Sequence, residues 1–385
     1  MKLILGLTAV LTGLLAWYFA AHSESGPLLR FSSSACYSCH INTLLETDGP
    51  IASGFSKGVH SIDENIINSP SVDMSGKNCG ICHTKVYDTW QKSAHGQAYT
   101  NEIYQQALKR DKQAWCIRCH APLWNESKDS INQASSGLNP DKTYSHGITC
   151  AVCHVRNNQI YGPNKTVSKD AIHPVKYDPT MKDERFCQGC HQFNFPEFIR
   201  PVVKYLDGPP MQNTVAEYHG TSWPAKGVTC QNCHFAPGDH SLHNAEQADL
   251  RRSFKTGIEV SGRGGRYSLK LSIYVKGIGH HYPTGDLFRI LTFKAFKADK
   301  EVLRYDIRKE VRAADMHTVS DTTLRPGKEG DVRFNKSFTL TENPQRCTLA
   351  YRLQGAIDPR LEKKISPGLL NRVLYDGPCK KKIQI

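Results

Sequence analysis

The last third of the chain shows the clearest pattern of apolar and polar positions. From Tyr267 to Val275 apolar and polar residues alternate with a period of two, and residues 332–340 repeat this alternation. Residues 290–297 alternate more loosely, and residues 347–353 form a further short segment of strand-like composition. Alternation with period two is typical of strands that bury one face. Several short strands separated by Gly and Pro turns therefore predict an all-β antiparallel sandwich over residues 251–385.

The first 23 residues have a different pattern. After Lys2 they run apolar from Leu3 to Ala21 and end at Ala21-His22-Ser23, which has the small-x-small form of a signal-peptide cleavage site. Residues 1–23 are therefore predicted to be an export signal. The apolar run is also close to the length of a membrane span, so an uncleaved N-terminal anchor is the alternative. Both interpretations place the rest of the chain outside the cytoplasm.

Residues 24–250 show neither pattern over a long stretch. The segment from Asp48 to Gly76 is rich in Gly, Ser and Asn and has no helical period, whereas residues 85–109 have the spacing of a helix. Only 39% of the whole chain is hydrophobic. We therefore expect a mainly α-helical and irregular domain of short helices and loops, whose interior is not built from aliphatic side chains alone.

One pentapeptide, Cys-x-x-Cys-His, occurs six times between Cys36 and His234. It is the attachment motif of c-type haem, in which both thiols bind the porphyrin and the histidine binds the iron. Zinc sites also combine Cys-x-x-Cys with histidine, but as tetrahedral sets that do not require histidine directly after every pair. We therefore predict six covalently attached haems, whose porphyrins form the core of residues 24–250. The haem-binding cysteines are Cys36, Cys39, Cys79, Cys82, Cys116, Cys119, Cys150, Cys153, Cys187, Cys190, Cys230 and Cys233, and the proximal iron ligands are His40, His83, His120, His154, His191 and His234.

The chain carries 49 Lys and Arg against 36 Asp and Glu, a net charge of +13. A charge of this size is typical of proteins that bind nucleic acid or acidic surfaces. The basic residues are spread along the chain, however, and the propionates of six haems would offset most of the excess. We therefore expect no nucleic-acid partner.

The second axial ligand decides whether a haem iron only carries electrons or also binds small molecules. Of the 17 histidines, ten lie outside the motifs and the leader, which is enough to give every iron a second imidazole. Three of them precede glycine, which lets the backbone approach a flat ring closely. The candidate distal ligands are His60, His95, His146, His219, His243 and His280, with His173 and His240 as alternates.

Two segments resemble a known family of multihaem proteins. Trp90-Gln-Lys-Ser93-Ala-His95 resembles the W-x-x-S-x-H element of the family that includes the tetrahaem electron acceptor of hydroxylamine oxidation and the hydroxylamine-oxidoreductase-like proteins. This resemblance implies that His95 is a distal ligand. Residues 227–243 resemble a later element of that family, which implies the same role for His240 or His243. The chain has no clear counterpart of the features that make some members catalytic.

Residues 279–285, Gly-His-His-Tyr-Pro-Thr-Gly, resemble the G-H-x-x-P-T-G element of β-domains fused to multihaem cytochromes. The resemblance implies that His280 completes the ligands of an iron. The competing interpretation is a structural turn set by Pro283 and Gly285. Outside the motifs, Cys347 and Cys379 remain, and in an exported chain they are predicted to form a disulfide rather than two free thiols.

These features together predict an exported hexahaem c-type cytochrome, in the periplasm or at the cell surface, which carries electrons along a close-packed haem relay between redox protein partners and is not an enzyme. One alternative is an oxidoreductase that acts on a small nitrogen or sulfur compound at a five-coordinate haem. Another is a self-assembling subunit of an extracellular cytochrome filament.

We predict that the purified protein keeps six haems per chain after denaturation in acidic organic solvent, because the six motifs attach them through thioether bonds. Intact mass and pyridine haemochrome absorbance per mole of chain measure this number. Pigment that separates from the polypeptide, or fewer than six haems per chain, would contradict the prediction.

Overall fold

The computed structural model describes residues 76–110, 116, 119–122, 147–156, 159–165, 173–199, 202–235, 239–242, 254–312, 316–353 and 371–380. The predicted leader, the first motif with Cys36, Cys39 and His40, and the candidates His60, His146 and His243 lie outside these residues. Among the helices that are described, none is long and apolar enough to cross a bilayer.

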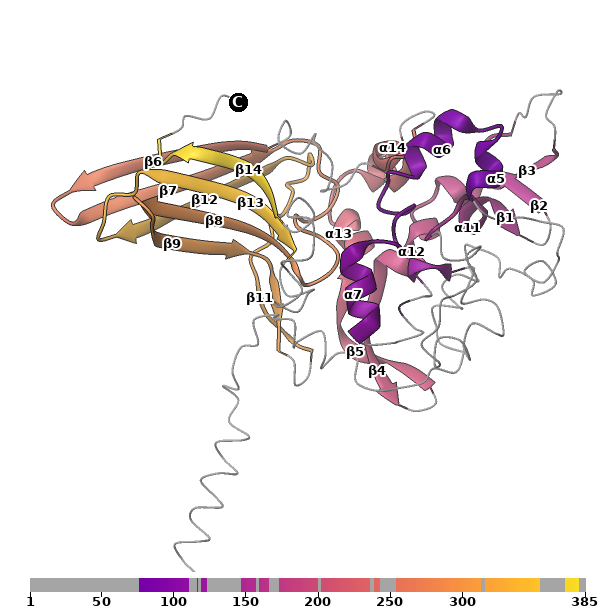
Figure 1. Ribbon diagram of the computed structural model, residues 1–385, viewed down its shortest axis with the longest axis horizontal. Coiled ribbons are helices and arrows are strands. Elements are labelled where there is room, and N and C mark those ends of the chain that lie inside the picture. The colour runs from indigo at the N-terminus through magenta and orange to yellow at the C-terminus, as the bar shows by residue number, and fades with distance from the viewer. Residues whose placement is uncertain are drawn as a thin grey trace, which may run out of the picture.

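The described residues from Phe254 onward form two antiparallel sheets that pack face to face, and we call this part the sandwich (Figure 1). One sheet has the strand order β12-β7-β6 and the other the order β14-β13-β8-β9, while β10 and β11 form a separate pair. The strands that alternation predicts are β7, β8, β12 and β13. The full set is β6 (Phe254–Arg263), β7 (Arg266–Val275), β8 (Arg289–Lys297), β9 (Lys300–Ile307), β10 (Lys309–Val311), β11 (Thr318–Asp321), β12 (Val332–Leu340), β13 (Arg346–Leu353) and β14 (Asn371–Pro378).

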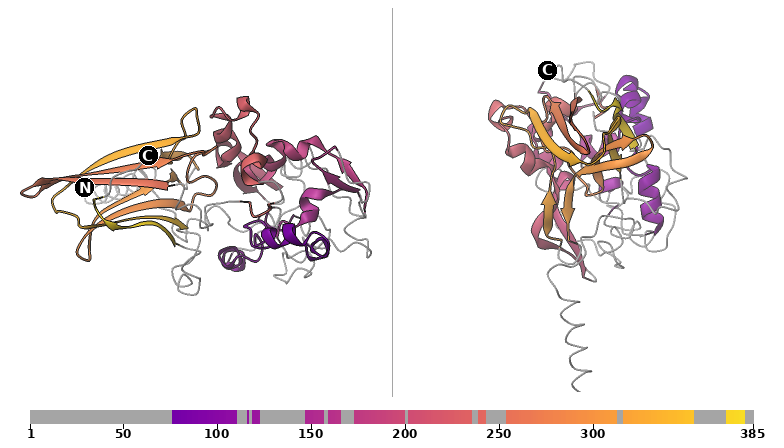
Figure 2. Two further views of the ribbon diagram at one scale, coloured as in Figure 1. Left: turned by 90° about the horizontal axis from the view of Figure 1, so that it is seen from above. Right: turned by 90° about the vertical axis from the view of Figure 1, so that its left-hand side faces the viewer.

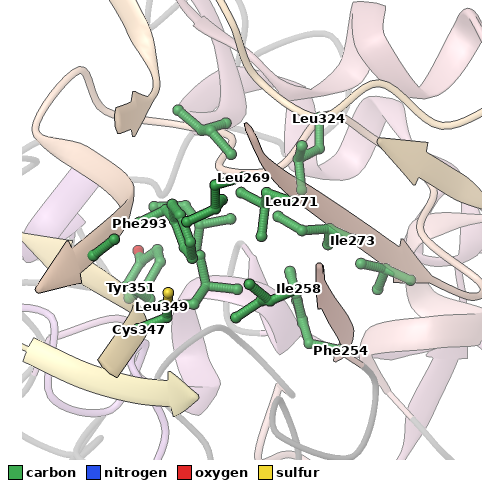
Figure 3. Close-up of a cluster of buried hydrophobic side chains, with 14 of the residues drawn as sticks. Phe254, Ile258, Leu269, Leu271, Ile273, Phe293, Leu324, Cys347, Leu349 and Tyr351 are labelled. Atoms are coloured by element: carbon green, nitrogen blue, oxygen red, sulfur yellow. The ribbon is translucent and has the colours of Figure 1, made fainter. Parts of the chain in front are cut away.

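The core of the sandwich lies between the two sheets. On β7, Leu269, Leu271 and Ile273 are at most 1% exposed, and the residues between them face outward. They meet Phe293 of β8 and Leu349 of β13 in one continuous apolar cluster (Figure 3). Burying a side chain of this kind contributes about 1.5–3 kcal/mol. The sandwich therefore has an aliphatic and aromatic core of its own.

The two cysteines outside the haem motifs form the predicted disulfide. Cys347 on β13 is bonded to Cys379, which directly follows β14, over a sequence separation of 32 residues. Both cysteines are buried at the edge of the apolar cluster. The bond therefore fixes the last strand of the sandwich to its neighbour.

The described residues 76–242, which we call the motif-bearing part, contain short helices separated by strands and loops. The helices α11 and α14 each begin at the first cysteine of a haem motif and end at its histidine. The helices are α5 (Gly76–Gly80), α6 (Thr84–Trp90), α7 (Glu102–Arg110), α11 (Cys150–His154), α12 (Arg185–His191), α13 (Thr214–His219) and α14 (Cys230–His234), and the strands are β1 (Val155–Arg156), β2 (Gln159–Gly162), β3 (Val175–Tyr177), β4 (Gln192–Ile199) and β5 (Val202–Asn213).

The predicted fold class is wrong, because the part expected to be mainly α-helical and irregular also contains two sheets. Strands β4 and β5 pair as an antiparallel hairpin, and β5 with its 12 residues is longer than any helix described. Phe193 and Phe195 alternate with polar residues, which is a strand signal. Pro196 weakens that signal, because proline cannot donate a ladder hydrogen bond, and the pairing shifts its register beside it. Across the described chain, strand residues outnumber helical ones.

The sandwich and the motif-bearing part lie end to end along the long axis of the molecule in two perpendicular views (Figures 1 and 2). Helix α13 and strand β5 lie on the side that faces the sandwich. Lys226 Nζ contacts Glu329 Oε2 at 2.6 Å, and Lys309 Nζ donates to the Pro210 carbonyl at 2.8 Å. Polar contacts therefore connect the two parts directly.

We predict that replacing Cys347 and Cys379 together by alanine lowers the free energy of unfolding of the sandwich by about 3–4 kcal/mol, because the bond closes a loop of 32 residues. Thermal denaturation followed by far-ultraviolet circular dichroism measures the change. The visible haem spectrum serves as the control and should stay as in the wild type. An unchanged melting temperature would contradict the prediction.

Candidate haem-binding site

The local sequence of two motifs explains how their cysteines and histidine come to share one helical turn. Thr149 and Thr229 directly precede α11 and α14 and have extended backbone, as N-cap residues do. At the second of these positions the Thr229 N–H donates to Asn232 Oδ1 at 2.7 Å. The helix then presents both cysteines and the histidine of the motif on a short rigid element.

Four motif histidines each face one other imidazole in the described part of the chain. The partner comes from a different motif-bearing segment or, in one case, from the sandwich. The ring centroids are separated by 6.1 Å for His83 and His173, 6.2 Å for His95 and His191, 6.4 Å for His154 and His240, and 6.3 Å for His234 and His280.

These separations fit one iron between the two rings of each pair. An imidazole nitrogen binds a metal ion at about 2.0–2.1 Å, and the centroid lies roughly 1 Å behind that nitrogen, so two rings on opposite sides of an iron have centroids about 6 Å apart. Rings in direct contact lie closer, as Tyr104 and His120 do with centroids 3.8 Å apart. Because the cysteines of a haem motif precede one histidine of each pair, the residues fit a haem held by two imidazoles.

Backbone carbonyls orient three of the iron-ligand candidates. The Nδ1 of His120 donates to the Ala98 carbonyl at 2.7 Å, and the Nδ1 of His154 donates to that of Tyr161 at 2.9 Å. In the sandwich loop, His280 Nδ1 donates to the His281 carbonyl at 2.8 Å. A hydrogen bond at Nδ1 leaves Nε2 as the nitrogen that can bind a metal.

Burial keeps the paired rings in the form that binds a metal. Burial lowers the pKa of His95 to about 3, and the nearby His191 adds to this effect. Burial likewise lowers the pKa of His191, His240 and His280. Neutral imidazole is the ligand form, so these side chains need not lose a proton at neutral pH before binding iron.

The Trp90-x-x-Ser93-x-His95 segment is held against the residues just before the fourth motif. The indole N–H of Trp90 donates to the Ile148 carbonyl at 2.8 Å, and the Ile148 N–H donates to the His95 carbonyl at 3.0 Å. Ser93 is fully buried, and its Oγ accepts the Gly96 N–H at 3.0 Å. These bonds determine where the His95 backbone lies, and so direct its ring toward His191.

The structure brings together some of the predicted distal ligands and not others. His95 and His280 each face a motif histidine, as do the two alternates His173 and His240. His219 instead lies with its Nε2 at 3.5 Å from a carboxylate oxygen of Glu184, and its side chain is 51% exposed. A following glycine is therefore a weak sign of a distal ligand, since His219 also has one. The alternates His173 and His240 have no such sign in their local sequence.

The third motif histidine has a different neighbour. Within the described residues, the ring packed on His120 is that of Tyr104, nearly parallel to it at 5°. The Tyr104 hydroxyl is buried and has no hydrogen-bond partner in the described structure, and burial raises its pKa. Sequence reasoning did not single out Tyr104, because one tyrosine in a helical segment gives no ligand signal.

Cysteines of different motifs lie next to one another. The Cys150 side chain adjoins that of Cys79, so the fourth and second motifs are neighbours. The Cys187 side chain adjoins that of Cys230, so the fifth and sixth motifs are neighbours. The Cys190 side chain adjoins that of Cys119 in the third motif. The attachment edges of these haem sites are therefore adjacent.

Comparisons with known proteins found similarity to cytochromes. Residues 22–162 match the family model described as outer membrane cytochrome MtrC/MtrF-like, domains II/IV. No curated protein matches the chain. Among solved structures, the chain is similar to the penta-haem cytochrome c552 from Thermochromatium tepidum, with 18% identity, a TM-score of 0.57, and coverage of 79% of this chain and 98% of that one. At this identity the likeness shows the fold alone.

The repeated attachment motifs, the facing imidazoles and these comparisons define the class of the protein. It is a multihaem c-type cytochrome that binds haem iron and transfers electrons. Its predicted export to the periplasm or the cell surface agrees with the matched family model, which describes an outer membrane cytochrome. The comparisons support this class without singling out the hydroxylamine-oxidoreductase-like family.

We predict that His173→Ala and His240→Ala each convert one ferric haem from low spin to high spin, because each removes an imidazole that faces a motif histidine. Low-temperature electron paramagnetic resonance, normalised to haem content, measures the conversion. His219→Ala is the matched control and should leave the spectrum unchanged. The same low-spin spectrum in all three variants would contradict the assignment.

Proposed function

We propose that the protein is a hexahaem electron relay that connects redox protein partners and has no catalytic site of its own. The relay would occupy residues 24–250, and the sandwich would supply one iron ligand. The observation that carries this proposal is the set of four imidazole pairs with centroids 6.1–6.4 Å apart. Two strong ligands saturate an iron, which favours electron transfer over substrate binding.

When bound, the haem irons supply the one-electron chemistry, and the chain supplies orientation, burial and spacing. The proximal ligands of the four pairs are His83, His154, His191 and His234, and the distal ligands are His173, His240, His95 and His280. For the first and third motifs, with His40 and His120, the remaining distal candidates are His60, His146 and His243. The resemblance of residues 90–95 to hydroxylamine-oxidoreductase-like proteins supports the same role for His95.

The contacts between cysteines support an order for the relay that differs from the order of the motifs. The second site adjoins the fourth through Cys79 and Cys150, and helices α5 and α11 pack together there. Cys153 of the fourth motif lies near both cysteines of the fifth. The fifth site then adjoins the third and the sixth. Electrons would therefore pass from the second site through the fourth and fifth to the sixth, with the third as a branch.

Both ends of this path lie near the surface. In the second motif Ile81 is 73% exposed, and Cys82 beside it is also exposed. In the sixth motif Cys233 is exposed. Exposed attachment edges are where a donor or acceptor protein can approach most closely, so we assign the two partner-facing ends to these motifs.

A second candidate function is an oxidoreductase that acts on a small nitrogen or sulfur compound at the third haem. The observation that favours it is the stacking of Tyr104 on His120, together with the buried Tyr104 hydroxyl.

Paramagnetic resonance of the ferric protein distinguishes the two functions. The relay predicts six low-spin haems whose spectrum does not change on addition of nitrite or hydroxylamine. A high-spin signal that shifts when either compound is added would favour the oxidoreductase. The Tyr104→Phe variant is then the control, since it should alter the shift only if the third haem binds the compound.

A further inference from the structure

The sandwich reaches the motif-bearing part through the loop of residues 279–285. This loop carries His280, whose ring is nearly parallel to that of His234, at 9° and with centroids 6.3 Å apart. His280 belongs to the sandwich, whereas the motif that it faces belongs to the motif-bearing part. Its position therefore depends on how the loop is held at the junction between the two parts. The hydrogen bonds at the junction show what holds it.

One carboxylate of the motif-bearing part binds this loop at two points. Glu217, on α13, accepts the backbone N–H of His281 at 3.2 Å and the hydroxyl of Thr284 at 2.6 Å through its Oε2 atom. Its Oε1 lies 3.6 Å from the His281 Nδ1. The hydroxyl of Thr284 also lies 2.8 Å from that of Thr214, at the start of the same helix. Both halves of the loop are therefore fixed to α13.

His281, the loop residue next to His280, connects Glu217 to the proposed iron ligand. The His281 N–H binds Glu217, and the His281 carbonyl accepts the Nδ1 proton of His280 at 2.8 Å. The Glu217 side chain is only 10% exposed, so its charge is poorly screened by water. Burial lowers the pKa of His280, and the nearby Glu217 carboxylate acts in the opposite direction.

We infer that Glu217 is a positioning residue for the iron ligand His280: it holds the loop that carries this imidazole on the sixth haem, and its buried charge acts on the ligand from outside the coordination shell. Partners of a metal-bound histidine commonly fix the orientation of its ring and make it a better donor. The inference rests on the proposed ligation of the sixth haem by His234 and His280. It means that this haem has its second axial ligand only while the sandwich is docked on α13.

The test compares Glu217→Ala with Glu217→Gln in the full-length holoprotein. Glu217→Ala removes both hydrogen bonds to the loop, so we expect a high-spin ferric signal of up to one haem per chain, which added imidazole returns to low spin. Glu217→Gln keeps an acceptor oxygen but removes the charge, so we expect a low-spin spectrum and one macroscopic reduction potential shifted upward. Paramagnetic resonance and spectroelectrochemical titration measure these changes.

Glu329→Gln is the matched control, because Glu329 also joins the two parts, through Lys226, but does not contact the loop. It should leave both spectrum and potentials unchanged. Wild-type spectrum and potentials in both Glu217 variants would overturn the inference. If Glu217→Ala does not accumulate with full haem content, the potential of Glu217→Gln decides, and an unchanged potential overturns it.

His280→Ala separates this inference from the proposed function. A high-spin haem in His280→Ala together with wild-type behaviour of the Glu217 variants would overturn only the role of Glu217. A wild-type low-spin spectrum in His280→Ala would instead overturn the ligation of the sixth haem, and with it the basis of the inference.

Discussion

The structure depends on one arrangement, in which two imidazoles are held 6.1–6.4 Å apart in each of four pairs, a separation that fits an iron between the rings. Each haem motif contains one histidine, which lies on a short helix in the fourth, fifth and sixth motifs, and it cannot provide the second imidazole. The second must come from an element that the chain brings in from elsewhere. The His95–His191 and His154–His240 pairs show how this works, since each joins two segments that are distant in sequence. The path of the chain through the motif-bearing part is therefore determined by where these rings must meet.

This arrangement also explains the contrast between the two parts of the molecule. Helices α11 and α14 have five residues each, too few to be stable alone. Haems attached at their motifs would supply the packing that such short helices need. The sandwich is stabilised differently, by a continuous apolar core that includes Leu269, Leu271 and Phe293 and by a disulfide at its end. The motif-bearing part would thus depend on its haems for stability, and the sandwich depends on ordinary apolar packing.

The junction between the parts has a chemical role as well as a structural one. The sandwich presents His280 to the sixth motif, and Glu217 on α13 binds the loop that carries it. Under the proposed ligation, the sandwich supplies part of an iron site. Because His280 and Glu217 lie on opposite sides of the junction, that ligation and the docking of the two parts would depend on each other.

The sequence alone determined what is local. Cysteine spacing identifies the attachment sites and proximal ligands, because covalent attachment requires the three residues within one turn, and alternation identifies strands such as β7 and β12, because each buries one face. It also indicated the Cys347–Cys379 bond, and it left residues 279–285 as either an iron-ligand loop or a structural turn. The tertiary structure decided which imidazoles meet: it pairs His173 and His240, leaves His219 beside Glu184, and places a β-hairpin after the fifth motif. The physical reason is that a distal ligand has no required neighbour in sequence, so only the path of the folded chain determines its partner.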